Sequence, residues 1–442
     1  MNQVQLATVE NWTPHPQASP HFAREGQGYV TEANGTRSCC GGWQFVFSGL
    51  EPGRWYEISL EATFADLACV RDALLCTAHW DRMEAGQART GFRPWDWILP
   101  ESAGEGRVRF ARIVQAPEDA SDLTVRCTFR WSTTGLALWS EPKVTLAEDR
   151  PASKPVRVAV VTGHANARPR PVESLQTNID FYGNLCRQAC EEVSPDLIAL
   201  PEIALQWGLP GSSLDLAVPL TSPEVQAFGS IARAFHTRIV LGMYERDGDA
   251  VFNSAVLLGP DGKVEGTYHK VHLAVGGEAE SGLMPGDGFP VVDTELGRIG
   301  FNICMDSSDA ESSRMVGLMG ADFLVLPIMG DHRADRWRPG PPTFGESRWQ
   351  AIMRTHAMDN QLCMVVARNT AVASCVIDRK GDILAWNEGD RDYVWCDVSL
   401  ADGYRTWNGG CFADVNWMQR RPHLYGAFTD EANQGSLRRA TR

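Results

Sequence analysis

Three side chains with complementary chemistry stand at the ends of short segments that predict strands. Glu202 follows the apolar run Asp196–Leu200, and Lys270 follows the strand predicted at Lys263–Tyr268. Cys304 ends an apolar run that predicts a third strand. A carboxylate can take the proton of a thiol and later activate water, while a buried ammonium lowers the pKa of a thiol and stabilises an oxyanion. Together they predict a thiol nucleophile that forms an acyl-enzyme thioester, which water then resolves.

Cys304 lies at a predicted corner between a strand and a helix. The apolar run before it begins after Gly297, and helical spacing resumes later at Met315, Leu318 and Met319. Backbone N–H groups at a helix start favour a thiolate. A buried structural role is the common one for a cysteine, and only the two charged residues at matching strand ends favour a nucleophile.

The backbone next to Cys304 supplies a further expected donor. The N–H of Met305 can donate to the same oxygen that the Lys270 ammonium stabilises. Met305 is therefore predicted to support the oxyanion.

The chain after residue 155 alternates predicted helices with predicted strands. Glu173–Val193 places apolar residues on one helical face, and Ser222 caps a second helix that has Pro223 in its first turn. Further strands and helices continue to about residue 400, which predicts an α/β layered domain. Neither a GxGxxG motif nor a P-loop motif occurs in it, which argues against dinucleotide or ATP chemistry.

Residues 1–150 have a different character and predict an antiparallel β-sandwich resembling a jelly roll. Eight of the fifteen tryptophans fall here, and turn-rich stretches separate the apolar segments. Galactose-binding and carbohydrate-binding modules share this order of segments. Tryptophans that fill the core are more common than tryptophans that stack on sugars, so an accessory packing domain is the expectation. The predicted strands are Trp43–Phe47, Trp55–Phe64, Leu74–Trp80, Arg107–Val114, Leu123–Trp131 and Leu136–Trp139.

Polar, proline-bearing residues 151–155 are the predicted linker, residues 156–400 the α/β domain, and residues 401–442 a C-terminal extension. The tail carries aromatic side chains that need covering, so we expect it to pack on a domain or on a second subunit.

Composition narrows the function classes further. The net charge of −14 disfavours nucleic acid and anionic membranes as partners. No apolar run is as long as a membrane span, and the first residues lack the features of a signal peptide. The scattered cysteines, without CxxC pairs, predict a cytoplasmic protein with no metal site.

Residues from about 156 to 400 resemble the nitrilase (carbon–nitrogen hydrolase) superfamily. The matching motifs, which follow one another in the family's order, are Leu200-Pro201-Glu202, Tyr268-His269-Lys270-Val271-His272-Leu273, Met284-Pro285-Gly286-Asp287, Gly300-Phe301-Asn302-Ile303-Cys304-Met305-Asp306 and Gly320-Ala321-Asp322.

The resemblance implies an αββα four-layer sandwich that forms homodimers or higher homo-oligomers. It maps the family's Glu-Lys-Cys triad onto Glu202, Lys270 and Cys304. It also implies hydrolysis or acyl transfer at non-peptide C–N bonds without a cofactor. Many members have an additional glutamate after the lysine, and both Glu278 and Glu280 fit that place.

A loop after Pro327 corresponds to a segment that lines the pocket in the family. Its arginines predict recognition of a substrate carboxylate, against the alternative of a solvated loop with local ion pairs. The candidate substrate-binding residues are Trp207, His332, Arg333, Arg336 and Trp337.

These observations favour a hydrolase acting on a small amide or N-carbamoyl compound. Nitrile-cleaving members commonly have Trp-Glu after the cysteine, where this chain has Met305-Asp306. Nitrile hydrolysis and acyl transfer on the same three residues remain alternatives. A carbohydrate-binding scaffold without catalysis is the alternative from another class.

Overall fold

The computed structural model describes residues 4–84, 87–88, 94–102, 104–148, 154–167, 171–275, 277–329, 345–400, 410, 414 and 417–430. The chain forms two compact units: Met1–Ala152 together with Asp402–Arg442, and Ser153–Ala401. The division falls within the predicted linker, and the predicted C-terminal extension clusters with the first unit.

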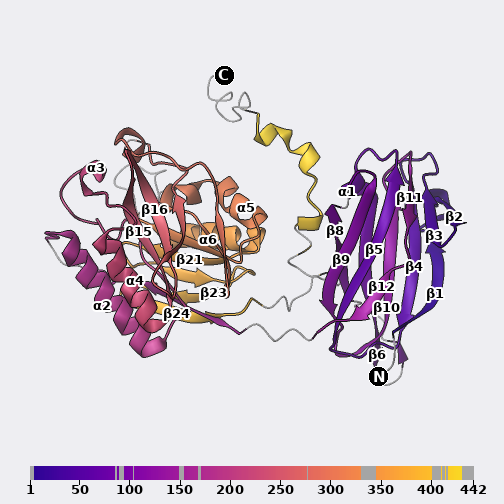
Figure 1. Cartoon of the computed structure of the whole chain (residues 1–442), viewed down its shortest axis with the longest axis horizontal. Helices are drawn as coiled ribbons and strands as arrows, with labels where there is room; N and C mark the ends of the chain where they lie inside the picture. Colours follow the sequence, from indigo (N-terminus) through magenta and orange to yellow (C-terminus); the bar gives the residue numbers. More distant parts are fainter. Residues whose placement is uncertain are drawn as a thin grey trace. The chain divides into compact units, whose positions relative to one another are not determined.

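The first unit is an antiparallel β-sandwich (Figure 1). Its strands follow the order β1-β4-β10-β6-β8-β9-β5-β11-β3-β2. Strand β8 joins the two layers, because Trp95–Ile98 pairs with β6 whereas Leu99–Ser102 pairs with β9. The strands are β1 Gln5–Trp12, β2 His21–Glu25, β3 Gly28–Glu32, β4 Cys40–Ser48, β5 Trp55–Ala65, β6 Leu74–Glu84, β7 Gln87–Ala88, β8 Trp95–Ser102, β9 Arg107–Gln115, β10 Ala120–Arg130, β11 Leu136–Trp139 and β12 Lys143–Leu146.

Large aromatic side chains fill the core of this sandwich. Trp80 and Trp139 are fully buried, and the Trp80 indole donates to the Asp96 carboxylate at 2.8 Å. Trp43 is buried as well, whereas Trp131 is exposed. The burial favours core packing over sugar stacking for most of these side chains.

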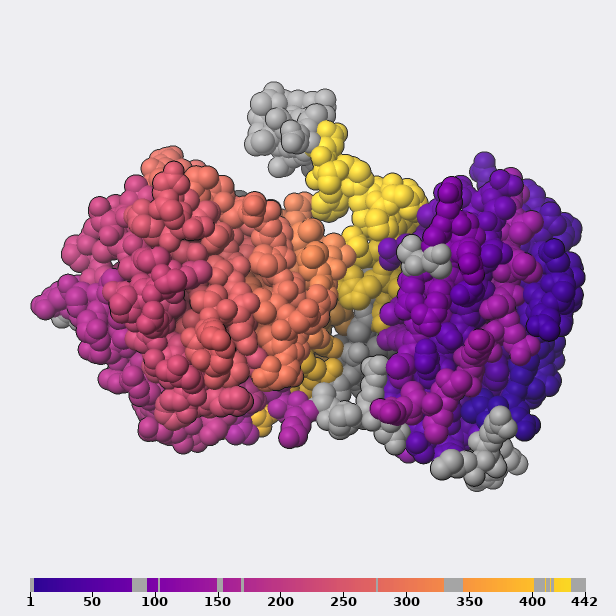
Figure 2. Space-filling model, viewed as in Figure 1, coloured from indigo at the N-terminus to yellow at the C-terminus, as the bar shows by residue number. Residues whose placement is uncertain are grey.

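The C-terminal residues of the first unit lie along its sandwich. Arg112 forms an ion pair with Asp414, and Arg71 donates to the carbonyl of Trp417 at 2.9 Å. In Figure 2 the near part of the yellow segment, residues 417–430, borders the sandwich, and the rest extends beyond it. The short elements of this unit are η1 Pro16–Ala18, α1 Val70–Ala73, η4 Pro422–Leu424 and η5 Gly426–Phe428.

The second unit contains two stacked sheets between two pairs of helices (Figure 1). One sheet has the order β17-β16-β15-β14-β13-β24, and the other has the order β18-β19-β20-β21-β22-β23. The strands are β13 Val156–Val161, β14 Leu197–Ala199, β15 Arg238–Asp247, β16 Ala250–Leu258, β17 Val264–His269, β18 Val291–Thr294, β19 Gly297–Phe301, β20 Phe323–Ile328, β21 Cys363–Arg368, β22 Cys375–Ile377, β23 Ile383–Trp386 and β24 Tyr393–Val398.

Alternation along the strands explains the layers. Val158 and Val160 of β13 point into the cluster between the sheets, whereas Ala159 and Val161 pack toward the helices. Because both faces are covered, β20 and β21 are buried along their whole length. The helical elements are α2 Leu175–Val193, α3 Ser213–Leu216, α4 Pro223–Phe235, α5 Ala310–Leu318, α6 Glu346–Asn360, η2 Glu278–Glu280 and η3 Cys304–Ser308.

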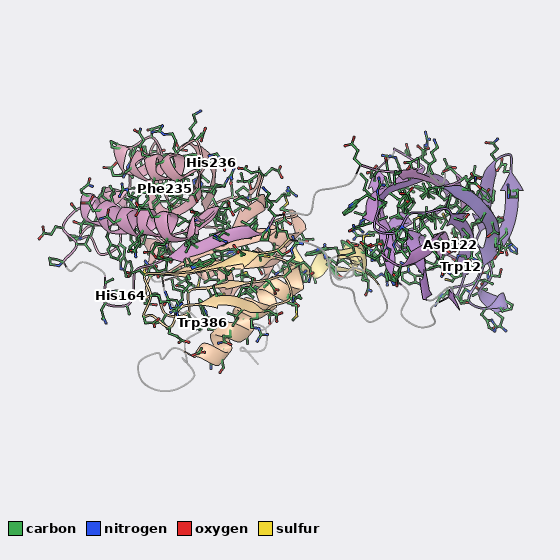
Figure 3. All side chains as sticks on the ribbon, turned by 90° about the horizontal axis from the view of Figure 1, so that it is seen from below. Trp12, Asp122, His164, Phe235, His236 and Trp386 are labelled. Atoms are coloured by element: carbon green, nitrogen blue, oxygen red, sulfur yellow. The ribbon has the colours of Figure 1, made fainter. Side chains whose placement is uncertain are left out.

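Helix ends and faces follow local signals only in part. Ser222 caps α4, and His236 ends it in a left-handed conformation next to Phe235 (Figure 3). The helical spacing at Met315 and Leu318 corresponds to α5, and both side chains are exposed there. Among the described residues, no helix is long and apolar enough to cross a membrane.

Candidate active site

Glu202 stands where β14 ends, and close backbone packing holds it there. Leu200 donates to the Val240 carbonyl at 2.9 Å, and Ile203 adopts a positive φ of 44°. A Cβ on Gly242 of the neighbouring strand would lie 2.2 Å from the Pro201 carbonyl oxygen. A β-branched residue at positive φ is strained, and such strain is common at functional sites. The carboxylate of Glu202 is 1% exposed.

Lys270 follows β17, and its ammonium joins two carboxylates. Its Nζ lies 2.9 Å from Glu202 Oε1 and 2.6 Å from Glu278 Oε2. Its backbone N–H donates to the Asn253 carbonyl, and its carbonyl accepts from Gly286. The side chain is 1% exposed. Burial alone would lower the pKa of Lys270, but the charges of Glu202, Cys304 and Glu278 and the hydrogen bond to Glu278 together outweigh burial, and the pKa is raised.

Glu278 is the glutamate that reaches this cluster, while Glu280 is exposed. Glu278 Oε1 accepts from Asn253 Nδ2 at 2.6 Å, and Oε2 accepts from the Ala274 N–H at 2.9 Å. Burial raises the pKa of Glu278, but the Lys270 ammonium and these hydrogen bonds lower it by more than burial raises it. The net pKa of Glu278 is therefore below its ordinary value. Glu278 is therefore held as a carboxylate.

Cys304 begins the 3₁₀ helix η3 at a strained corner. Its φ is +48°, and its carbonyl accepts from the Ser307 hydroxyl at 2.7 Å. Burial raises the pKa of the Cys304 thiol well above its ordinary value. The Glu202 charge and a hydrogen bond to Glu202 raise it further, whereas Lys270 and the Met329 N–H lower it. The resting group is thus a neutral thiol paired with a carboxylate.

Asp306 connects the turn that carries Lys270 to the turn that carries Cys304. Its fully buried carboxylate accepts from the Tyr268 hydroxyl at 2.7 Å and from the Ile303 N–H at 2.8 Å. It also accepts from the N–H of His272 at 2.9 Å. The two turns therefore cannot separate without leaving buried donors unpaired.

Two further side chains near the triad escaped the sequence reasoning. Asn253 Nδ2 donates to Glu202 Oε1 at 2.8 Å as well as to Glu278, so it orients both carboxylates. Burial, followed by the charges of Glu278 and Glu202, raises the pKa of Tyr244 to about 12. Both residues lie on the paired strands β15 and β16, which are buried along most of their length, and the sequence carries no signal that would single them out.

Of the other predicted site residues, the structure describes Met305 and Trp207. Met305 lies in the first turn of η3, where backbone N–H groups have no partner within the helix. Trp207 is half-buried, and its carbonyl accepts from Asn178 at 3.0 Å. His332, Arg333, Arg336 and Trp337 lie outside the described residues.

Comparisons with known proteins agree with this architecture. Residues 157–406 match the carbon–nitrogen hydrolase family. A citrullinase from Francisella tularensis is 29% identical over 224 residues, which are 46% of this chain and 74% of that protein. The omega-amidase NIT2-B of Xenopus laevis is 27% identical over 277 residues, which are 58% of this chain and 92% of that protein.

A solved structure confirms the predicted fold of the second unit. A carbon–nitrogen hydrolase from Helicobacter pylori aligns with a TM-score of 0.50 at 20% identity, over 63% of this chain and 99% of that chain. With more than half of the chain matched by the family, the protein belongs to the carbon–nitrogen hydrolases of the nitrilase superfamily and is a C–N hydrolase.

Proposed function

We propose that this enzyme cleaves a C–N bond of a small amide or N-carbamoyl compound through a thioester on Cys304. One observation carries the proposal: the Glu202 carboxylate accepts hydrogen bonds from both the Lys270 ammonium and the Cys304 thiol. Base, cation and nucleophile are thus in contact before substrate binds.

Acylation begins with transfer of the thiol proton from Cys304 to Glu202 while sulfur attacks the carbonyl carbon. The Lys270 ammonium and the Met305 N–H stabilise the oxyanion of the tetrahedral intermediate. Glu202 then returns the proton to the departing nitrogen. The C–N bond breaks, and ammonia or an amine leaves the thioester behind.

Deacylation repeats the proton transfers with water. Glu202 takes a proton from water as the water oxygen attacks the thioester carbon. When the C–S bond breaks, Glu202 returns this proton to sulfur, which releases the acid and regenerates the thiol. Glu278 keeps a carboxylate beside Lys270 throughout. We assign Glu278, rather than Glu280, the role of positioning the ammonium, the substrate and the attacking water.

The substrate class rests on two supports. The relatives named citrullinase and omega-amidase suggest a small compound with a ureido or a terminal amide group. The arginines of the loop after Pro327 suggest a carboxylate on the same compound. Unchanged KM for carboxylated substrates in the Arg333→Ala and Arg336→Ala variants, with equal activity on neutral amides, would remove the second support.

The alternative reactions share the same thioester. Nitrile cleavage is disfavoured by Met305-Asp306. Acyl transfer differs only in the acceptor, and product analysis with an added amine separates the two outcomes.

We also propose a homodimer through helices α5 and α6. Met315, Leu318 and Met319 of α5 are exposed, and so is Met358 of α6. Arg314 donates to the Asp359 carbonyl at 2.8 Å, which joins the two helices on this side. Apolar side chains grouped on a helix pair are typical of a subunit contact.

The experiment is mass spectrometry of the intact protein and its peptides after incubation with a library of small amides. We expect an acyl adduct on the peptide that contains Cys304, and loss of turnover of at least about 10⁴-fold in Cys304→Ala. Cys396→Ser, which changes a half-buried cysteine of β24, is the matched control. It should still form the acyl adduct on the Cys304 peptide and should turn over substrate at the parent's rate. Turnover at the normal rate in Cys304→Ala would refute the proposal.

A further inference from the structure

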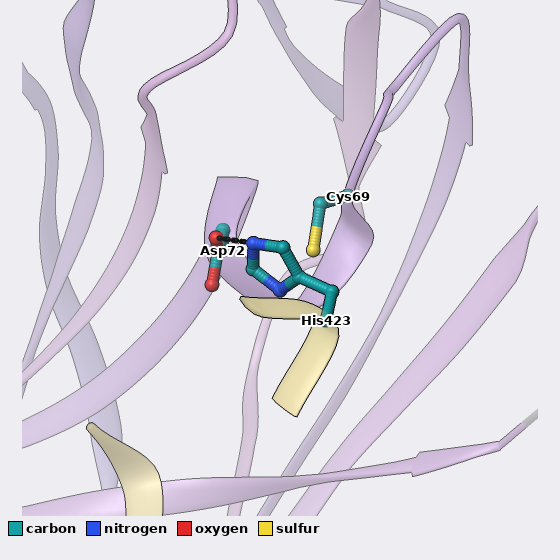
Figure 4. Close-up of side chains that lie close together, drawn as sticks. All are labelled: Cys69, Asp72 and His423. Carbon is teal, nitrogen blue, oxygen red and sulfur yellow. Dashed lines mark ion pairs between the residues drawn. The ribbon is translucent and has the colours of Figure 1, made fainter. Parts of the chain in front are cut away.

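Three potential metal ligands converge in the first unit, far along the chain from the residues of the proposed triad. Cys69 caps the short helix α1, and Asp72 lies within that helix three residues later. His423 comes from η4 in the C-terminal segment. Their sulfur, oxygen and nitrogen ligand atoms all lie within 4.8 Å of one another, and Figure 4 shows the three side chains facing a common point.

We propose that Cys69, Asp72 and His423 bind a divalent transition-metal ion of the Zn²⁺ class. A thiolate, an imidazole and a carboxylate are all ligands that Zn²⁺ accepts, and residues three apart on a helical turn face the same side. The separation of 3.6 Å between His423 Nε2 and Asp72 Oδ2 already suits two ligands of one tetrahedral ion. Bonds of about 2.0–2.3 Å place ligand atoms roughly 3.3–3.8 Å apart in such a site.

The sulfur requires only a small adjustment. Cys69 is half-buried and caps a single turn of helix, so rotation of its side chain can shorten a separation of up to 4.8 Å. On binding, the thiol releases its proton to solvent and sulfur bonds to the metal. Three protein ligands leave a fourth position for water.

One local cation competes with the ion. Arg421 donates to Asp72 Oδ2 from Nη2 at 2.9 Å and from Nε at 3.1 Å. The Asp72 oxygen that lies 3.6 Å from His423 Nε2 is the same one that Arg421 contacts, so Arg421 and the ion compete for Oδ2. The Asp72 side chain is only 13% exposed, and Arg421 supplies its cationic partner when no metal is bound.

The site would fasten the C-terminal segment to the sandwich. His423 is separated from Asp72 by most of the chain, and ion pairs and hydrogen bonds already join the C-terminal segment to the sandwich. An ion that bridges both parts stabilises the folded unit by linkage, because the ligands are not assembled in the unfolded chain.

The test titrates the full-length protein with Co²⁺ alone and with Zn²⁺ alone, in a Cys304→Ala background that removes the buried thiol of the second unit. We expect one equivalent of Co²⁺ with a thiolate-to-cobalt charge-transfer band, displaced by Zn²⁺. Cys69→Ser should abolish that band, and His423→Ala should weaken Co²⁺ binding at least about tenfold. Arg421→Gln should strengthen binding, because it removes the competing cation.

The matched control is Cys40→Ser, which changes a half-buried cysteine of the same sandwich outside the cluster. It should bind Co²⁺ as the parent does. Absence of stoichiometric binding by the parent, or an unchanged band in Cys69→Ser, would overturn the proposal. Far-ultraviolet circular dichroism of each variant checks the fold, and the parent's cobalt spectrum decides the question even where a variant fails to fold.

Discussion

The Asp306 carboxylate accepts a hydrogen bond of 2.7 Å from the Tyr268 hydroxyl, which ties the end of β17 to the turn after β19. Lys270 stands two residues after Tyr268, and Cys304 stands two residues before Asp306. A fully buried contact thus fixes the separation of the proposed cation and nucleophile without touching either. The Asp306 carboxylate therefore helps to set the relative position of the two turns.

The first prediction concerns Asp306→Asn. The amide keeps the shape but turns one acceptor into a donor that faces either the Ile303 N–H or the His272 N–H. We expect a loss of about 1–3 kcal/mol in the free energy of unfolding, because a buried donor is left unpaired. A fall in kcat/KM of roughly tenfold or more should accompany it, because the reacting groups are misplaced. Urea unfolding and steady-state kinetics measure the two effects.

Asp309→Asn is the matched control for that variant. Asp309 caps helix α5 through a hydrogen bond to the Glu311 N–H, and asparagine caps a helix equally well. The control should keep both stability and activity. Equal behaviour of the two variants would show that Asp306 has no special positioning role.

The second prediction separates the two loop glutamates. Glu278→Gln removes the carboxylate that lies 2.6 Å from Lys270 Nζ, whereas Glu280→Gln changes an exposed side chain of the same turn. We expect Glu278→Gln to lower kcat on the order of 10²-fold, since a preorganised charge is lost at the site. Glu280→Gln should behave as the parent enzyme does. The reverse ranking would reassign the role to Glu280.

A third prediction concerns the pH dependence of stability. A hydrogen bond to Asp306 raises the pKa of His272, burial opposes this, and the charges of Asp306, Asp309 and Glu311 add to the increase. A pKa that is higher in the folded state contributes stability that is fully present below the unfolded pKa of about 6.5. That contribution is lost as the pH rises through the folded pKa.

The measurement compares the parent with His272→Gln by urea unfolding between about pH 5.5 and 9. The difference in unfolding free energy between the two proteins should be largest at the acidic end and should shrink as the pH rises. Subtracting the unfolding free energy of the variant from that of the parent at each pH cancels the contribution of the titratable groups that the two proteins share. A difference that is constant with pH, or that grows toward alkaline pH, would contradict the assignment.

The sequence predicts which residues follow a strand. Glu202, Lys270 and Cys304 each follow a predicted strand, and these strands correspond to β14, β17 and β19. Glu278 could not be distinguished from Glu280, because the choice depends on how the loop folds back so that the Ala274 N–H meets the carboxylate. Loop closure of this kind leaves no periodic signal in the residues.

Helix α5 buries polar side chains that its helical spacing does not single out. Its buried side includes Ser312 and Ser313, whose hydroxyls lie within hydrogen-bonding distance of His272 and His356. These polar residues are paired in the interior, whereas Met315 and Leu318 are exposed. In the first unit, strands β1 and β2 were not predicted, because their burial patterns are largely exposed and give little alternation.

The fourth prediction uses the strained backbone of Cys304. Its φ of +48° is unfavourable for any residue with a Cβ, so replacement by glycine relieves strain that alanine retains. Both Cys304→Gly and Cys304→Ala should be inactive, but the glycine variant should be more stable to urea by about 1 kcal/mol. Cys363 is a buried residue of β21 whose φ is not positive. There the alanine variant should be more stable than the glycine variant, because glycine in a strand interior is destabilising. An alanine variant at position 304 that is as stable as the glycine variant would show that the corner stores no backbone strain.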